Sequence, residues 1–412
     1  GNDILIQSLI NEGVEYIFGY PGGAALHIYD SIFNQKEMQH ILVRHEQGAT
    51  HAADGYARAT GKPGVVLVTS GPGATNAITG IATAFMDSIP MVIISGQVQS
   101  HLIGTDAFQE TDMIGVSRPI VKHSFTVDKQ ENIANIVAEA FHIATSGRQG
   151  PVLIDVPKDL TNPDDLFDFV YPDKVHVRSY NPPIKPENHQ VSRAVDAILA
   201  SERPVIYAGG GTISSNASKE LRELNDLIDA PVTNTLMGLG VFPGTHKRFL
   251  GMLGMHGTYQ ANMAMHNADL IIALGARFDD RITNAPDKFA PRAKVIHFDV
   301  DHSSVSKIIE ADIAVFGQIK DSLQAINNHL KTKIDEIDNE KLAPWHQQIS
   351  DWKEKHGLNH DLYKIEDDSG PILPQAAVQH IYQESQGKAF VTSDVGQHQM
   401  FAAQYYHFDE PR

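Results

Sequence analysis

The chain has no cysteine among its 412 residues, and this absence removes several kinds of chemistry at once. Without cysteine there is no disulfide, no thiolate nucleophile and no cysteine-ligated zinc. Basic residues are also few, because 33 Lys and Arg stand against 50 Asp and Glu, giving a formal net charge of −17. Nucleic acids and anionic membrane surfaces are bound through basic patches, so neither is an expected partner.

Several motifs and long apolar runs are missing as well. No run of apolar residues is long enough for a membrane helix, and residues 1–20 lack the basic start and cleavage motif of a signal peptide, so we expect a cytoplasmic protein. The phosphate-binding pattern GxxxxGK[ST] does not occur. His45-Glu46 resembles the start of HExxH, but Ala49 follows and the next histidine is His51. Six residues do not share one helix face, so zinc-hydrolase chemistry is not expected and no metal ligand is predicted.

The sequence does contain alternating strand-like and helix-like runs, which predict mainly parallel sheets covered by helices on both faces. In residues 1–170 the predicted strands are Val14–Phe18, Ile41–Val43, Val65–Val68, Met91–Ser95 and Pro151–Val156, with Ile41–Val43 expected to be buried. The predicted helices there include Ile4–Asn11, Gln47–Thr60, Ala74–Phe85 and Glu131–Ser146. Residues 188–330 repeat the pattern, with strands near Pro204–Ala208, Leu270–Leu274 and Lys294–Phe298.

Two poorly apolar stretches divide the chain into predicted domains. Residues 171–187 are proline-rich and form a predicted linker, and residues 331–370 form a charged connector. Residues 371–412 begin a third unit with a predicted helix, Pro374–Ser385, and a predicted strand, Ala389–Ser393. Because so short a segment cannot bury a core of its own, we expect it to be the opening of a third α/β domain.

Glu46 is the most informative single residue. It lies between a predicted strand and a predicted helix, which is where open α/β sheets place their ligands. Two glycine-rich turns, at 19–23 and 70–76, follow strand-like runs in the same region. Together they indicate an organic-cofactor site, although an acid in the first turn of a helix also occurs for electrostatic reasons alone.

The second predicted domain carries its own candidates, each with an ordinary alternative. Gly209–Gly211 could cradle a phosphate or could be only a turn. Arg277 follows a predicted strand and could bind an anion or pair with Asp279 or Asp280. Asp299 ends the next strand, where acids can accept hydrogen bonds from ribose hydroxyls. In the first domain, Lys158 could be a surface cation or could contact the substrate.

The order of motifs resembles the catalytic large subunits of the acetohydroxyacid synthase (acetolactate synthase) family, which are thiamine-diphosphate enzymes. The resemblance covers essentially the whole chain. Its motifs are FGYPGG (18–23), RHEQGA (44–49), TSGPGATN (69–76), DAFQE (106–110), DVPKD (155–159), GMLGMHGT (251–258), GARFDDR (275–281) and SDVGQHQM (393–400).

The resemblance implies roles for individual residues. Glu46 would hydrogen-bond N1′ of the aminopyrimidine of thiamine diphosphate, and Arg277 would hold the carboxylate of a second 2-oxoacid, a task that suits a planar fork. Phe108, Gln109, Lys158 and Met255 would complete the catalytic set. The other implied contacts to thiamine diphosphate are Tyr20, Pro21, Gly22, Gly23, Thr69, Pro72, Asn76, Gln397 and His398.

The family also binds FAD in its central domain. The resemblance carries that site to Arg148, Gly209, Gly210, Gly211, Met252, Leu253, His256, Gly275, Arg277, Asp279, Asp299 and Val300. Mg²⁺ ligands are expected beyond Arg412, so we interpret the chain as truncated within its diphosphate-binding domain. By itself it is then expected to hold FAD but to make no acetolactate.

The implied activity is decarboxylation of pyruvate and transfer of the two-carbon unit to pyruvate or 2-oxobutyrate, in branched-chain amino-acid biosynthesis. The implied assembly is a homodimer or larger homo-oligomer, with room for a regulatory small subunit. Three alternatives remain: a pyruvate oxidase, a glyoxylate carboligase, and a non-catalytic flavin-binding fragment. Glyoxylate carboligase is disfavoured because it lacks the activating acid that Glu46 would supply.

Overall fold

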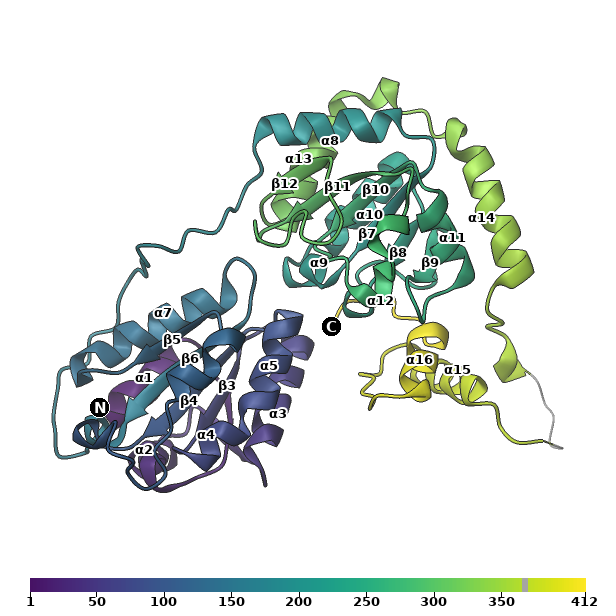
Figure 1. Cartoon of the computed structure of the whole chain (residues 1–412). Coiled ribbons are helices and arrows are strands. Elements are labelled where there is room, and N and C mark those ends of the chain that lie inside the picture. Colours follow the sequence, from purple (N-terminus) through teal and green to yellow (C-terminus); the bar gives the residue numbers. More distant parts are fainter. Residues whose placement is uncertain (365–369) are drawn as a thin grey trace. The chain divides into compact units, whose positions relative to one another are not determined.

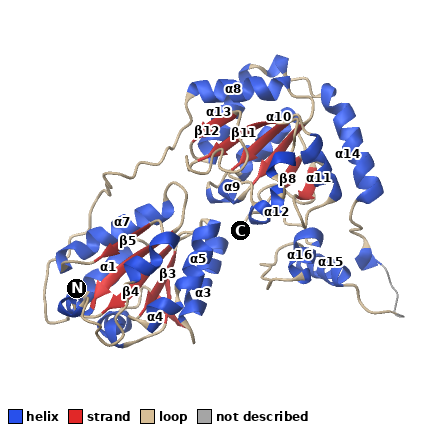
Figure 2. Cartoon of the chain, in the orientation of Figure 1, coloured by secondary structure: helices blue, strands red, loops and turns tan. Residues whose placement is uncertain are grey.

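Two compact units make up the chain, Gly1–Asn181 and Pro182–Arg412, in a computed structural model that describes residues 1–364 and 370–412. Each unit contains one six-stranded, fully parallel sheet between layers of helices (Figures 1 and 2). This confirms the predicted class of consecutive doubly wound α/β domains. The division between the units falls inside the predicted linker, and residues 371–412 belong to the second unit. The finer five-part division stays a prediction.

The first sheet has the strand order β2-β1-β3-β4-β6-β5. Its strands are β1 Tyr16–Gly19, β2 Gln39–Leu42, β3 Gly64–Val68, β4 Met91–Gln97, β5 His123–Thr126 and β6 Pro151–Pro157. Its helices are α1 Asn2–Asn11, α2 Leu26–Asn34, α3 Glu46–Thr60, α4 Pro72–Asn76, α5 Ile78–Asp87, α6 Met113–Ser117 and α7 Ile133–Thr145.

The central strands of this sheet are buried along their whole length. All residues of β3, β4 and β6 are buried, as expected for parallel strands with helices on both faces. Side chains of α1, α2 and α7 pack on one face, and those of α3 and α5 pack on the other. Helix α3 ends at Thr60 and is capped by Gly61, whose φ of 73° is the left-handed conformation that suits glycine.

Two sequence predictions in this unit need correction. The strand predicted as a buried run at Ile41–Val43 is the edge strand β2, in which Ile41 is 38% and Leu42 is 65% exposed. An edge strand has a neighbouring strand on one side only, so its other side is open to solvent. The apolar composition of the run does not show whether the strand lies at the edge or in the middle of the sheet. The single helix predicted at Ala74–Phe85 is two helices, α4 and α5, and it begins earlier because Pro72 occupies the first turn.

The second sheet has the order β12-β11-β10-β7-β8-β9. With β7 counted as strand 1 and the sheet read from the β9 edge, this is the order 3-2-1-4-5-6 of dinucleotide-binding folds. The strands are β7 Pro204–Ala208, β8 Val232–Asn234, β9 Phe249–Met252, β10 Leu270–Leu274, β11 Lys294–Asp299 and β12 Ile313–Phe316. The helices are α8 Asn188–Ala200, α9 Gly210–Ser214, α10 Ser218–Ile228, α11 Tyr259–Asn267, α12 Asp280–Thr283, α13 Ile319–Thr332, α14 Ala343–His356, α15 Pro374–Ser385 and α16 Gln397–Tyr405.

The strand predicted at Ala389–Ser393 is wrong, because this segment is not a strand in the structure. Phe390 is 74% and Val391 is 38% exposed. A strand needs a neighbour for its ladder of hydrogen bonds, and no strand of the described residues pairs with this segment. The helix predicted before it, α15, has the predicted bounds.

None of the helices in the described parts of the chain combines the length and apolar character that crossing a membrane requires.

Candidate active site

The carboxyl edge of the first sheet brings together loops that are far apart in sequence. All six strands are parallel, so the segments after β1, β2, β3, β4 and β6 leave the sheet at the same edge. The strand order reverses between β1 and β3, and ligands of open α/β sheets bind at such a reversal. The two glycine-rich turns follow these two strands, and Glu46 follows β2, the neighbour of β1.

Glu46 is the buried acid at this edge. It begins α3 and is only 8% exposed. Asn76, the last residue of α4, donates a hydrogen bond from Nδ2 to Oε2 of Glu46 over 3.0 Å. Among the described residues no other hydrogen bond reaches this carboxylate, so Oε1 is left to interact with a ligand. A buried acid with one oxygen held and the other available can exchange a proton with a bound molecule.

Glycines allow the three loops to approach one another closely. A Cβ atom on Gly22 would lie 2.4 Å from Cγ2 of Thr69. A Cβ on Gly73 would lie 2.7 Å from the same carbon and 3.3 Å from Oε1 of Glu46. The hydroxyl oxygen of Thr69 in turn accepts a hydrogen bond from the backbone N–H of Ala24 over 3.2 Å. A side chain at Gly73 would therefore lie against the acid, and one at Gly22 would push the turn after β1 away from Thr69.

The loop after β4 reaches the same glycine turn. Gly71 has a φ of +59°, and a Cβ there would lie 2.5 Å from the carbonyl oxygen of Gln109. Gln109 itself has a φ of 60°, a conformation uncommon for residues with a side chain. The neighbouring Phe108 is 89% exposed. The structure therefore places Phe108 and Gln109, two predicted catalytic residues, at the turn that lies beside Glu46.

Glu110 closes this loop. Its carboxylate accepts hydrogen bonds from the backbone N–H groups of Gly104 and, over 3.0 Å, Ala107. These bonds, that from Gly104 foremost, hold the pKa of Glu110 below its usual value, because they stabilise the charged form. The loop is fixed by an ionised acid, so the geometry of Gln109 is retained at neutral pH.

Lys158 lies at the same edge, directly after β6, in a short 3₁₀ turn that covers Lys158–Thr161. The next residue, Asp159, accepts hydrogen bonds from the backbone N–H of Ser100 over 2.8 Å and from its hydroxyl over 3.1 Å. This contact joins the loop after β6 to the loop after β4. Tyr20, Pro21 and Gly23, from the turn after β1, are exposed beside the reversal of strand order.

Sequence reasoning missed the buried acid Asp155 of β6. It is 3% exposed, and Nε2 of Gln97 donates to its Oδ2 over 3.1 Å and to the carbonyl oxygen of Thr111 over 2.8 Å. Burial raises the pKa of Asp155 to about 6. Gln97 thus ties the acid to the end of the loop that carries Phe108 and Gln109. An acid inside an apolar run was the signal that could have identified it.

In the second unit, the strand order reverses between β7 and β10, and glycines occupy the loops after both strands. A Cβ on Gly209 would lie 2.4 Å from the carbonyl oxygen of Gly275, and a Cβ on Gly211 would lie 2.7 Å from its Cα. The N–H of Gly211 donates to that same carbonyl over 3.1 Å. Close packing of two loops therefore accounts for Gly209 and Gly211, and Gly210 lies between them.

Arg277 pairs with Asp279, the alternative that the sequence left open. The guanidinium donates from Nη2 to Oδ2 of Asp279 over 2.7 Å, at a position that is partly exposed. Burial would raise the pKa of Asp279, but hydrogen bonds from the N–H of Arg281 and from Arg277 outweigh it, so the pKa is lowered. The guanidinium of Arg277 therefore already contacts one carboxylate, that of Asp279.

Phe278 anchors the loop between these two charges. It is 1% exposed and has a φ of 54°. Its ring lies 5.6 Å from that of Tyr207 and 5.3 Å from that of His297. Tyr207 and His297 both pair with Ala273 across the sheet, so the small side chain of Ala273 leaves room for the ring. Burial lowers the pKa of His297 to about 4, so this histidine is neutral near pH 7.

The other residues predicted to bind FAD are distributed over the carboxyl edge of the second sheet. Met252 is 7% and Leu253 is 2% exposed, whereas His256 is exposed and so is Met255, the predicted acceptor contact, at 60%. Oδ1 of Asp299 accepts the N–H of Asp301 over 2.8 Å, and Val300 lies between them. Gln397 and His398 begin α16 in this same unit.

Arg148, the remaining residue predicted to bind FAD, belongs to the first unit. Its Nε donates to the hydroxyl oxygen of Ser88 over 2.8 Å. Both residues follow helices and precede strands, so they lie at the amino edge of the first sheet, opposite Glu46. A contact of Arg148 with FAD stays a prediction. Within the described residues, no cluster of three or more His, Asp or Glu side chains has the arrangement of a metal site.

Comparison with known proteins adds the family context. Residues 1–116 match the model for "Thiamine pyrophosphate enzyme, N-terminal TPP binding domain", and residues 191–326 match "Thiamine pyrophosphate enzyme, central domain". The chain is 54% identical over 412 residues to the acetolactate synthase large subunit of Buchnera aphidicola subsp. Schizaphis graminum. It is 51% identical over 412 residues to the acetolactate synthase isozyme 3 large subunit of Escherichia coli K12. In both cases the alignment covers 100% of this chain and 71% of the relative.

Proposed function

Since the chain belongs to the acetolactate synthase large-subunit family, we propose that it acts in the joining of two 2-oxoacids. Pyruvate loses carbon dioxide, and its remaining two-carbon unit is transferred to a second pyruvate or to 2-oxobutyrate. The products are 2-acetolactate and 2-aceto-2-hydroxybutyrate, precursors in branched-chain amino-acid biosynthesis. The single observation that carries this proposal is the buried Glu46 among the glycine turns of the first sheet.

The first unit has the features that an aminopyrimidine would need. Glu46 offers Oε1 for a ring nitrogen while Asn76 holds Oε2. Gly73 keeps a side chain away from that oxygen, since a Cβ there would lie 3.3 Å from it, and Gly22 lets its turn pack against Thr69. When bound there, thiamine diphosphate would supply the carbon nucleophile and the electron sink for decarboxylation. In this site Glu46 would hold and exchange a proton at a ring nitrogen, and Tyr20, Pro21, Gly23, Thr69 and Pro72 would enclose the ring.

Arg277 would bind the carboxylate of the acceptor 2-oxoacid. Its guanidinium already accommodates a carboxylate, that of Asp279, and a planar fork can engage two oxygens at once. Phe108 and Met255 are exposed apolar side chains that would contact the alkyl group of the acceptor. Gln109 and Lys158 would orient the substrate near the reacting carbon.

The second unit would bind FAD. Its strand order is that of dinucleotide-binding folds, and its glycines lie at the reversal between β7 and β10. Asp299 lies at the end of β11, where an acid can accept hydrogen bonds from ribose hydroxyls. For Mg²⁺, no described residues cluster as ligands, so none of them is assigned to the ion that would accompany the diphosphate.

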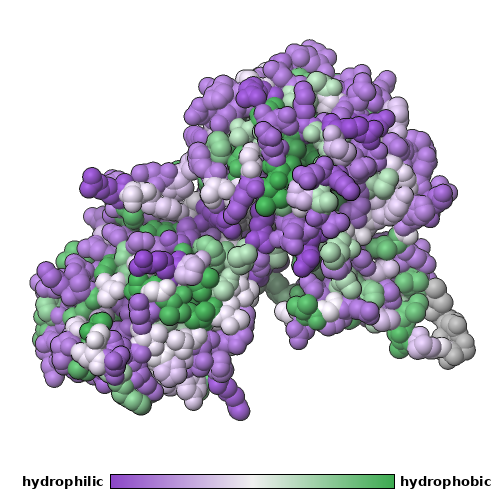
Figure 3. All heavy atoms as spheres, viewed as in Figure 1, coloured by the Kyte–Doolittle hydropathy of each residue, from purple (hydrophilic) through white to green (hydrophobic). Residues whose placement is uncertain are grey.

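The proposed assembly is a cytoplasmic homodimer or larger homo-oligomer with a regulatory small subunit. The relatives are named large subunits, which implies a smaller partner. Apolar residues gather in patches on the visible faces of both units (Figure 3). In the first unit Phe33 is 86% and Leu42 is 65% exposed, and such surfaces are typical of protein contacts. Sedimentation showing only active monomers would contradict this assembly.

The decisive experiment uses a protein that spans the whole length of the relatives. It is incubated with pyruvate, Mg²⁺ and thiamine diphosphate while acetolactate, carbon dioxide and flavin absorbance are followed together. We expect acetolactate and carbon dioxide to appear while the flavin stays oxidised. Bleaching of the flavin with oxidation of pyruvate would instead identify a pyruvate oxidase. Flavin binding without carbon dioxide release would identify a non-catalytic protein.

A further inference from the structure

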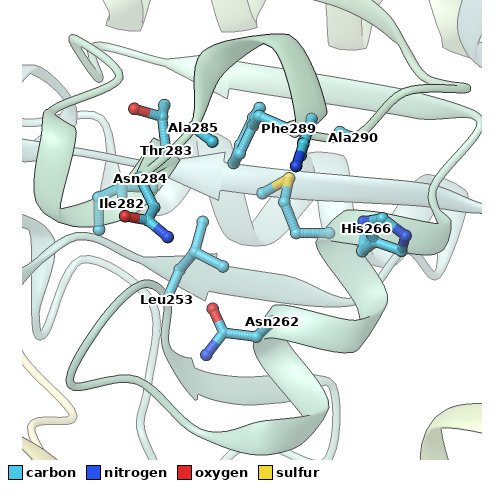
Figure 4. Close-up of a pocket in the computed structure, with 11 residues that line it drawn as sticks. Leu253, Asn262, His266, Ile282, Thr283, Asn284, Ala285, Phe289 and Ala290 are labelled. Atoms are coloured by element: carbon cyan, nitrogen blue, oxygen red, sulfur yellow. The ribbon is translucent and has the colours of Figure 1, made fainter.

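The second unit contains a cavity of about 310 Å³ between α11 and residues 282–290. Figure 4 shows the labelled side chains around it, with Asn262 and His266 on one side and Ile282, Asn284 and Phe289 on the other. The cavity volume is at the lower end of the range of small-molecule sites in proteins. Of the residues predicted to bind FAD, only Leu253 also lines this cavity.

The inner wall of the cavity is apolar. Leu253 and Met265 are each 2% exposed and belong to the core of the unit, and Phe289 packs against that core. The oxygen and the nitrogen of the Asn262 amide each bond to Gly254, because the amide donates to its carbonyl oxygen over 3.0 Å and accepts its N–H over 3.0 Å. The interior therefore suits an apolar group.

The mouth of the cavity is polar and has cationic character. Its exposed lining residues include His266, Asn284 and Lys288. Asp287 adjoins Lys288 in the chain, yet no ion pair of Lys288 with an acid occurs among the described residues. In a chain of formal net charge −17, an ammonium group that no carboxylate neutralises is a local attraction for an anion.

The segment that forms this mouth has a constrained backbone. Asn284 has a φ of 53° and Ala290 has a φ of 42°, both in the left-handed region. A β-carbon makes that region unfavourable, and such strain concentrates at ligand sites and switch segments. The ring of Phe289 also lies 5.9 Å from that of Phe278, edge to face, so the cavity wall is in contact with the anchor beside Arg277.

We propose that this cavity binds a small carboxylate of about six carbons with an apolar tail. The tail lies against Leu253, Met265 and Phe289, and the carboxylate lies at the mouth, where Lys288 donates a charge-assisted hydrogen bond and Asn284 and His266 add polar contacts. The site is separate from the one assigned to thiamine diphosphate, and the proposal does not depend on the proposed function.

The test compares two probes, 4-methylpentanoate and the neutral 4-methylpentan-1-ol, by calorimetry and saturation-transfer NMR on the protein before and after the addition of FAD. The carboxylate is expected to bind more tightly than the alcohol. Lys288→Met removes the charge and keeps the apolar stem, so it should weaken the carboxylate about tenfold and leave the alcohol unchanged. Ala285→Phe places a ring at the mouth and should weaken both probes.

Lys320→Met is the matched control, because Lys320 is an exposed lysine of α13, whose side chains pack on the opposite face of the sheet. It should leave both affinities as in the wild type. Both test positions are exposed, so the variants are expected to keep the thermal midpoint of the wild type. No binding of either probe, equal carboxylate affinity in Lys288→Met, or loss of binding when FAD is added would each overturn the proposal.

Discussion

Asn76 and Glu46 are thirty positions apart in sequence, yet the amide of Asn76 lies 3.0 Å from Oε2 of Glu46. The contact joins the end of α4 to the start of α3, and so joins the loops after β3 and β2. An amide is a neutral donor, so it orients the carboxylate without adding the charge that a lysine or arginine would bring. The pair thereby fixes which oxygen of Glu46 is left for a ligand.

Replacing Glu46 with Gln tests the acid directly. The change keeps size and the hydrogen bond to Asn76 but removes the titrating group, so acetolactate formation should fall by about 100-fold or more. The variant should fold normally, as circular dichroism would show. Asn76→Ala is the matched comparison, since it removes the hydrogen bond that orients the carboxylate but keeps the acid. Acetolactate formation should fall less in this variant than in Glu46→Gln. Turnover within about tenfold of wild type in Glu46→Gln would contradict the role of the acid.

The sequence predicted the central strands well and the outer ones poorly. β7 and β10 have the predicted bounds because each is a continuous apolar run in the middle of a sheet. β5, β8, β9 and β12 were missed, since they are strands of three or four residues whose pattern is too short to be distinctive. Ala389–Ser393 shows the opposite error, because a suitable run does not form a strand without a neighbouring one.

The candidate site was predicted as a set of residues but not as a geometry. Motifs placed Glu46, Gly22 and Asn76 at one edge, because parallel strands end together. The hydrogen bond from Asn76 and the contact of Gly22 with Thr69 depend on how closely two loops pack, which no local pattern encodes. For Arg277, anion binding and pairing with Asp279 or Asp280 were both consistent with the sequence, and the distance to Asp279 was needed to show the pairing.

Arg277→Lys should separate the two half-reactions. Lysine keeps the charge but loses the fork, so binding of the acceptor carboxylate should weaken by about ten- to 100-fold. Decarboxylation of the first pyruvate should be affected less, so the ratio of acetaldehyde to acetolactate should rise. The companion variant Asp279→Asn removes the internal competitor and should lower the KM for the acceptor. An equal loss of both half-reactions in Arg277→Lys would mean that this residue serves the fold or the flavin instead.

Gly71→Ala should destabilise the first unit. The residue has a φ of +59°, and a Cβ would lie 2.5 Å from the carbonyl oxygen of Gln109, so both the backbone and the packing oppose the change. We expect a loss of about 2 kcal/mol or more in the free energy of unfolding. Gly13→Ala is the control, because its φ is +74° but nothing lies within 4 Å of the added carbon. If both variants lose the same stability, the contact between Gly71 and Gln109 contributes nothing.

Asp155 should make the stability of the first unit depend on pH. Its folded pKa is raised by burial to about 6 from an ordinary value of 3.8, so the fold favours the protonated form. The nearby acid Asp112 acts in the same direction. Protonated Asp155 therefore contributes its full stabilisation below about pH 4, and this contribution is lost as the pH rises to about 6. The free energy of unfolding should fall by roughly 3 kcal/mol over this range.

Asp155→Asn removes this titration. An amide does not titrate, so it changes the free energy of unfolding by an amount that is the same at every pH. Relative to the wild type, the variant should therefore gain stability between pH 4 and 6, and the difference between the two should stay constant above pH 6. Both tryptophans, Trp345 and Trp352, lie in α14 of the second unit, so their fluorescence does not follow this change. Amide hydrogen exchange in β4 and β6 measures it directly, with Asp30→Asn on the exposed face of α2 as control. If the stabilities of the Asp155→Asn variant and the wild type change in parallel over the whole pH range, Asp155 has the same pKa in the folded and the unfolded chain. That result would contradict the prediction.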